Sequence, residues 1–121
     1  MTTRTPALAI FDNSVSEAAF QRQVIALAQL CGWAFCYHTR DSRGSARGFP
    51  DLVLMRVRPP RLLVVELKSA RGKVTDAQAD WLAAFDACGV ERYVWRPSDW
   101  PAIEAVLAPR PDAWRNKEAT A

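Results

Sequence analysis

The sequence predicts an α/β domain with a mixed four-stranded sheet flanked by helices, in the chain order helix, three strands, helix, strand, helix. Three observations support this. Apolar residues recur at helical spacing in residues 14–31 and 75–88, and two apolar strand-like runs are joined by a diproline turn. A further strand-like run follows the second helix, which returns the chain to the same sheet.

The first helix is expected over residues 14–31, where apolar side chains repeat every three or four positions and Gly32 ends the run. Residues 33–38 (WAFCYH) are rich in aromatics and predict a strand. Residues 39–48 are polar, basic and punctuated by glycine, which is typical of a loop.

The next two strands, residues 49–57 and 62–69, form a hairpin about the RPPR turn. The second helix, residues 75–88, carries an apolar stripe of Ala79, Leu82, Phe85 and Cys88. A fourth strand over residues 90–96 precedes a short helix, residues 98–107, that we expect to start at Ser98 with a proline in its first turn.

At 121 residues the chain has the length of one domain, which we place at residues 14–107 between an N-terminal arm (1–13) and a C-terminal tail (108–121). No apolar run approaches the roughly 20 residues needed to span a bilayer. The N-terminus lacks the basic and apolar regions of a secretion signal. We therefore expect a cytoplasmic protein that does not bind membranes.

Positive charge is concentrated in the middle of the chain. Residues 40–73 contain nine basic and three acidic residues, whereas the rest of the chain is net acidic. Such clustering is expected where a protein binds a polyanion, because neutralised phosphates release counterions. It also fits a solvated basic surface, and charge alone does not separate the two interpretations.

The run LLVVELKS (residues 62–69) places Glu66 and Lys68 on one face of a strand whose apolar neighbours indicate burial. If RPPR is a four-residue loop, Asp51 lies opposite Lys68; if the loop is only Arg58 and Pro59, Asp51 lies opposite Glu66. In both registers the three charged groups share one face at one end of the hairpin.

Two carboxylates in a buried position repel each other, and one lysine compensates only in part. A divalent cation with hard oxygen ligands, Mg²⁺ or Mn²⁺, resolves the conflict and leaves positions for phosphate oxygens. Asp51 and Glu66 are therefore candidate metal ligands, and Lys68 is a candidate catalytic residue that orients water or offsets charge on phosphorus. The alternative is a strand-start aspartate and an exposed ion pair on an edge strand.

These residues resemble the PD-(D/E)XK nuclease motif, with Pro50-Asp51 followed after fourteen residues by Glu66-Leu67-Lys68. The segments HTRDSRGSARGFPDL, ELKSARGKVTDAQ and YVWRPSDW, together with Glu17, resemble the VRR-NUC (virus-type replication-repair nuclease) family in its stand-alone, phage-type form. The resemblance covers about residues 14–107.

The resemblance implies a restriction-endonuclease-like core and metal-dependent cleavage of DNA, often branched, in a bacterial or phage-infected cell. By the same resemblance, Leu67 contributes a main-chain carbonyl to the metal, Glu17 assists from the first helix, and Gln78 completes the catalytic site. The sequence departs from the family pattern at none of these positions.

The basic loop side chains are candidate DNA-binding residues, because guanidinium groups hold phosphate well. They are Arg40, Arg43, Arg47, Arg71 and Lys73. His38 could act as an acid or base, although a lone histidine at a strand end is more often simply hydrogen-bonded. We expect no small-molecule cofactor. Symmetric cutting of two strands requires two sites, which suggests a homodimer.

Several alternatives stay open. Ser14 to Glu17 and Thr75 to Gln78 both fit capping boxes, so Glu17 and Gln78 have structural explanations as well as catalytic ones. The whole chain could also be a nucleic-acid-binding module without catalysis. Finally, a nuclease of this kind could act on RNA or single strands instead of branched DNA.

Overall fold

The sheet contains four strands, which lie side by side in the order β1 (Phe35–His38), β2 (Leu52–Val57), β3 (Pro60–Leu67) and β4 (Glu91–Trp95). The first three strands are antiparallel, and β4 runs parallel to β3. This computed structural model describes residues 14–39 and 46–109. The predicted mixed four-stranded sheet is confirmed.

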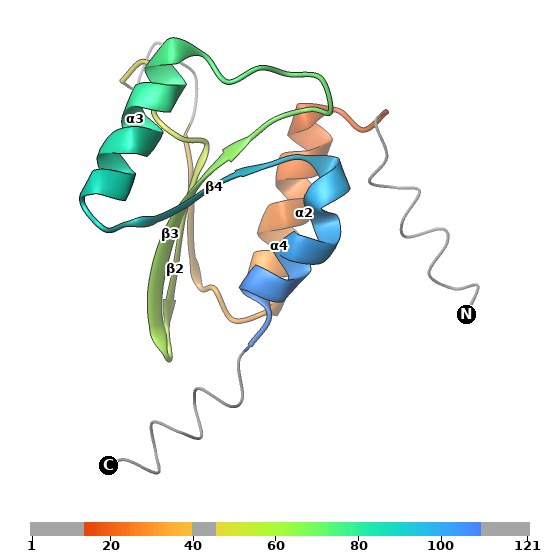
Figure 1. Ribbon diagram of the computed structural model, residues 1–121. Helices are drawn as coiled ribbons and strands as arrows, with labels where there is room; N and C mark the ends of the chain where they lie inside the picture. Colours follow the sequence, from red (N-terminus) through yellow and green to blue (C-terminus); the bar gives the residue numbers. More distant parts are fainter. Residues whose placement is uncertain (1–13, 40–45, 110–121) are drawn as a thin grey trace.

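Helices cover both faces of the sheet (Figure 1). Helices α2 (Glu17–Leu30) and α4 (Trp100–Leu107) pack together on one face, and α3 (Asp76–Ala87) lies on the other. A short 3₁₀ helix, η1 (Pro97–Asp99), connects β4 to α4. The predicted chain order αβββαβα is therefore observed.

The hydrophobic core lies between the sheet and the pair α2 and α4. One face of α2 contributes fully buried apolar residues at helical spacing, and alternate residues of β2 and β3 meet them. The core residues are Phe20, Val24, Ala28, Trp33, Leu52, Leu54, Leu63, Val65, Leu67, Trp95, Ile103 and Leu107. The intervening residues of β3, which include Glu66, therefore point to the α3 side.

Helix α2 starts two residues later than the capping-box interpretation required. Its N-cap is Ser16, whose hydroxyl accepts a hydrogen bond from the Ala19 N–H at 3.1 Å. Val15 then precedes the cap, and both Val15 and Phe20 pack in the core cluster, the arrangement of a hydrophobic staple. The Ser14 to Glu17 capping box is wrong, because Ser16 caps the helix and Glu17 is its first residue.

The β2–β3 turn is the tighter of the two predicted turns. Val57 pairs with Pro60 and Leu52 with Val65, so the loop is Arg58 and Pro59 alone. Pro60 is the first residue of β3, a strand position that proline tolerates. The four-residue RPPR loop is therefore wrong.

The later helices differ from the predicted patterns in detail. The sheet-facing side of α3 carries Trp81, Leu82 and Phe85, whereas Ala79 and Cys88 are exposed. Helix α4 begins at Trp100 after the 3₁₀ turn, not at Ser98. Residues 1–13 and 110–121 lie outside the described residues, as do Arg40 and Arg43.

Candidate active site

The two-residue turn places Asp51 directly opposite Glu66. The pairing of Leu52 with Val65, continued by one residue, brings these two carboxylates together. The Asp51 Oδ2 atom accepts a hydrogen bond of 2.7 Å from the Leu67 N–H. On the other side, the Thr39 N–H donates to the Asp51 carbonyl at 2.8 Å. Asp51 is thus held at the end of β2 by both neighbouring segments.

Glu66 is a buried carboxylate with only 2% of its surface exposed. Its Oε2 atom accepts a hydrogen bond of 2.8 Å from Gln78 Nε2 and lies 3.5 Å from Lys68 Nζ. Its Oε1 atom is buried and accepts no hydrogen bond from any residue that the structure describes. Burial first, and then the neighbouring Asp51, raise the pKa of Glu66 to about 8.

Gln78 serves two structural roles at once. Its Oε1 atom accepts a hydrogen bond from the Thr75 N–H at 2.9 Å, while the Thr75 hydroxyl accepts one from the Gln78 N–H at 3.2 Å. This reciprocal capping box leaves the amide nitrogen free to donate to Glu66. The capping interpretation is confirmed, and the same side chain reaches the candidate site.

Lys68 follows β3 directly, and its backbone N–H donates to the Trp95 carbonyl at 3.0 Å. Its side chain is 10% exposed, which is low for a lysine. The ammonium group is therefore fixed beside Glu66 instead of extending into solvent.

Glu17 lies at the border of this cluster. It is exposed as the first residue of α2, and its Oε2 atom accepts a 3.4 Å hydrogen bond from the N–H of Ser69, next to Lys68. Within residues 14–39 and 46–109, no three His, Cys, Asp or Glu side chains form a group that could hold a metal ion. The structure brings Glu17 near the site without adding its carboxylate to the pair of Asp51 and Glu66.

Three of the five predicted DNA-binding residues fall within the described chain. Arg47 lies in the loop that leads to β2, and Arg71 and Lys73 lie in the loop between β3 and α3; all three are exposed. Both loops adjoin the start of α3, where Gln78 contacts Glu66. The loops that carry these basic residues therefore border the site. His38 is exposed at the end of β1.

The loop before Asp51 packs against α3 through Gly48, Phe49 and Trp81, for which the sequence predicted no role. Gly48 has a φ of +84°, and a Cβ built there would lie 2.5 Å from the Ala77 carbonyl carbon. Beside it, the Trp81 indole N–H donates to the Arg47 carbonyl at 3.0 Å, and the Phe49 ring contacts Trp81 edge to face at 5.0 Å. The turn that positions Asp51 thus requires glycine at residue 48.

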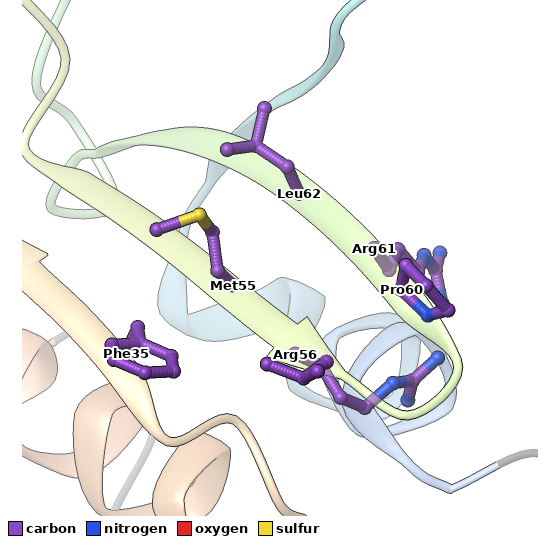
Figure 2. A pocket seen from close by; sticks show the side chains of 7 residues that line it. Phe35, Met55, Arg56, Pro60, Arg61 and Leu62 are labelled. Carbon is purple, nitrogen blue, oxygen red and sulfur yellow. The ribbon is translucent and has the colours of Figure 1, made fainter.

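On the α3 side of the sheet, towards the hairpin turn, apolar side chains are exposed. They form what we call the open sheet face: Phe35, Tyr37, Met55, Val57 and Leu62. Phe35, Met55 and Leu62 lie in register on three adjacent strands (Figure 2). Part of this face lines a groove of about 480 Å³.

Comparisons with known proteins point to one family. The sequence profile of the VRR-NUC domain matches residues 10–99. A solved structure described as a VRR_NUC domain protein aligns with a TM-score of 0.56 and 17% identity, covering 77% of this chain and 85% of that chain, and so shows a shared fold. No curated protein matches. No helix in the described part of the chain is long and apolar enough to cross a membrane.

Proposed function

The chain belongs to the VRR-NUC domain family, and on this premise we propose that it is a Mg²⁺- or Mn²⁺-dependent nuclease that hydrolyses phosphodiester bonds in DNA. The observation that carries the proposal is the buried carboxylate of Glu66 beside Asp51. A buried carboxylate normally finds hydrogen-bond donors or a cation, and Glu66 Oε1 has no donor among the described residues.

The oxygen atoms at this position fit a hard divalent cation. Asp51 and Glu66 offer carboxylate oxygens, and the Leu67 main-chain carbonyl is a third ligand by family analogy. The raised pKa of Glu66 supports the same fit, because a cation in contact would favour the ionised carboxylate that burial and Asp51 disfavour. Glu17, which lies at the border, could assist through a water molecule.

Neighbouring residues orient the two carboxylates, and Lys68 provides positive charge. A bound divalent cation would polarise the scissile phosphate and lower the pKa of a water ligand. The Leu67 N–H holds Asp51, and Gln78 holds Glu66, so both carboxylates have fixed orientations. Lys68 places a positive charge where negative charge develops on the phosphate as water attacks and the ester oxygen leaves.

The exposed basic residues at the border support a nucleic-acid substrate. Arg47, Arg71 and Lys73 are exposed on the two loops that adjoin the start of α3, so they could contact phosphates that flank the bond to be cut. They lie on loops and offer no array for reading base edges. This arrangement favours recognition of DNA shape, such as a junction or flap, over sequence.

The open sheet face supports a homodimer. Its five side chains are 40–59% exposed. Together they expose on the order of 400 Å² of apolar surface, about half of the roughly 800 Å² that each partner contributes to a standard interface. Leu62 and Glu66 are separated by about 13 Å along β3. A second copy seated on this face would therefore bring two active sites close together, as symmetric cutting requires.

A cleavage assay tests the catalytic proposal. Labelled junction, flap, duplex and single-stranded DNA, and RNA of the same sequences, are incubated with Mg²⁺, Mn²⁺ or EDTA. We expect cleavage of branched DNA with either metal and none in EDTA. Glu66→Gln and Lys68→Ala should each lower the rate at least about 100-fold, whereas Arg92→Gln, an exposed change on β4, should not.

Other outcomes of this assay would change the proposal. If both active-site variants cut as fast as the parent, the site assignment fails. If the parent binds DNA and cuts nothing under any condition, the chain is better described as a binding module with a nuclease fold. Preferred cutting of RNA or single strands would keep the chemistry and change the substrate.

Sedimentation of the purified protein tests the dimer. We expect Leu62→Glu to dissociate it, because a charge at the centre of an apolar interface has no partner. Leu30→Glu is the matched control, since Leu30 is 84% exposed on α2 and lies away from the open sheet face. A parent protein that is monomeric and fully active would refute the dimer.

A further inference from the structure

The loop that follows Lys68 is held by one arginine from the neighbouring strand. Arg96, directly after β4, donates hydrogen bonds from Nη1 to the carbonyls of Ser69 at 2.7 Å and Gly72 at 2.6 Å. These carbonyls are three residues apart, so one guanidinium closes the 69–72 loop. Arg96 lies in the YVWRPSDW segment, but the sequence predicted no role for it, because its partners are backbone atoms.

The closed loop covers the side chain of Lys68. A Cβ built on Gly72 would lie 3.4 Å from Lys68 Cδ, so the Gly72 backbone packs against the methylene chain of the lysine. The Gly72 N–H donates to both the carbonyl and the hydroxyl of Ser69. Lys68 is consequently 8% exposed, and its ammonium is confined to the side of Glu66.

The backbone of Arg96 is itself held by hydrogen bonds. Its backbone N–H donates to Asp99 Oδ2 at 2.9 Å, and its carbonyl accepts from the Asp99 N–H at 2.8 Å. One residue earlier, the Trp95 carbonyl accepts from the Lys68 N–H. The same short segment therefore fixes the backbone of Lys68 directly and its side chain through the loop.

We propose that Arg96 is a positioning residue for catalysis, which holds the 69–72 loop over Lys68 so that the ammonium group stays beside the two carboxylates. The inference rests on the proposed nuclease function for the role of Lys68. The hydrogen bonds of Arg96 to the Ser69 and Gly72 carbonyls support its role in holding the loop. Arg96 acts through the loop and touches no substrate.

The first test measures the loop without requiring catalysis. Hydrogen exchange of the Gly72 amide is compared in the parent, Arg96→Gln and Arg92→Gln. Arg92 is the matched control, because it lies on the same strand edge, is exposed and pairs only weakly with Asp86 at 3.6 Å. We expect exchange in the 69–72 loop to rise at least about tenfold in Arg96→Gln alone, with core amides unchanged.

The second test separates positioning from substrate binding. With the best-cut DNA, Arg96→Gln should lower kcat by about 10- to 100-fold and leave KM within about twofold, because misplacement of a catalytic group acts on the chemical step. Arg96→Lys, which can still donate to both carbonyls, should recover part of the lost rate. A merely structural role would not produce this split or this rescue.

Opposite results would overturn the inference. Unchanged exchange of the 69–72 loop in Arg96→Gln would show that the arginine does not hold it. A raised KM with unchanged kcat, and a salt dependence of DNA binding reduced by about one counterion, would make Arg96 a phosphate contact instead. If the loop opens in Arg96→Gln but the parent never cuts any substrate, the nuclease function is refuted. The role of Arg96 in holding the 69–72 loop is then still supported.

Discussion

Substitution of Glu66 by glutamine should make the protein more stable at neutral pH when no divalent cation is present. The folded-state pKa of Glu66 is raised from 4.5 to about 8, so the folded protein keeps a proton there that the unfolded chain releases. The stability linked to this proton is fully present below pH 4.5 and is lost as the pH rises through 8. Glutamine, which can still accept from Gln78, does not titrate.

The size of the effect follows from the shift. Each pKa unit is worth about 1.4 kcal/mol, so the unfolding free energy of Glu66→Gln relative to the parent should rise by about 3 kcal/mol between pH 5 and pH 8. Using the change with pH, and not the absolute difference, removes the pH-independent effect of replacing a carboxyl by an amide, and the attraction to Lys68 is already included in the folded-state pKa.

The assay is urea unfolding in EDTA, followed by tryptophan fluorescence at several pH values. Glu104→Gln, the same chemical change on the exposed side of α4, is the control for the substitution itself. Added Mg²⁺ or Mn²⁺ should stabilise the parent at pH 8 and leave Glu66→Gln unchanged. A stability difference that is flat with pH, or that falls towards pH 8, would refute the reasoning.

Two further predictions concern the framework around the site. Gly48→Ala should lower both stability and cleavage, since the new Cβ would clash with Ala77; a loss of more than about 2 kcal/mol is expected in urea unfolding, against about 1 kcal/mol for Gly89→Ala, which has a similar φ but open space. Glu91→Gln should cost about 1 kcal/mol at pH 7 by breaking the paired hydrogen bonds with Arg61. Hydrogen bonding to Arg61 lowers the pKa of Glu91, so the stability lost in Glu91→Gln should shrink as the pH falls through that lowered pKa. A loss that grows in acid would contradict the assignment.

The sequence was sufficient for the sheet and for the central pair of carboxylates. Apolar periodicity separated helices from strands, and charged residues within an apolar run marked the candidate site. Both turn registers placed Asp51, Glu66 and Lys68 on one face, so the prediction did not depend on choosing correctly between them. The structure selects the register in which Asp51 faces Glu66.

Details that depend on tertiary contacts were beyond the sequence. The segment SVSE offers two capping serines, and the structure uses Ser16, with Val15 packed against the core cluster. On α3 the predicted apolar stripe included Ala79 and Cys88, which are exposed. The half-buried side instead includes Gln78, a polar residue that apolar periodicity does not identify. The role of Arg96, within the YVWRPSDW segment, was not predicted because its partners are backbone carbonyls, which every residue carries.

Binding of Mn²⁺, followed by the loss of the free-ion signal in electron paramagnetic resonance, tests the central claim most directly. We expect the parent protein to bind Mn²⁺, Mg²⁺ to compete for the same position, and Glu66→Gln and Asp51→Asn each to weaken binding at least about tenfold. Equal binding by the parent and both variants, or none by the parent, would contradict the assignment of these two carboxylates to a metal site.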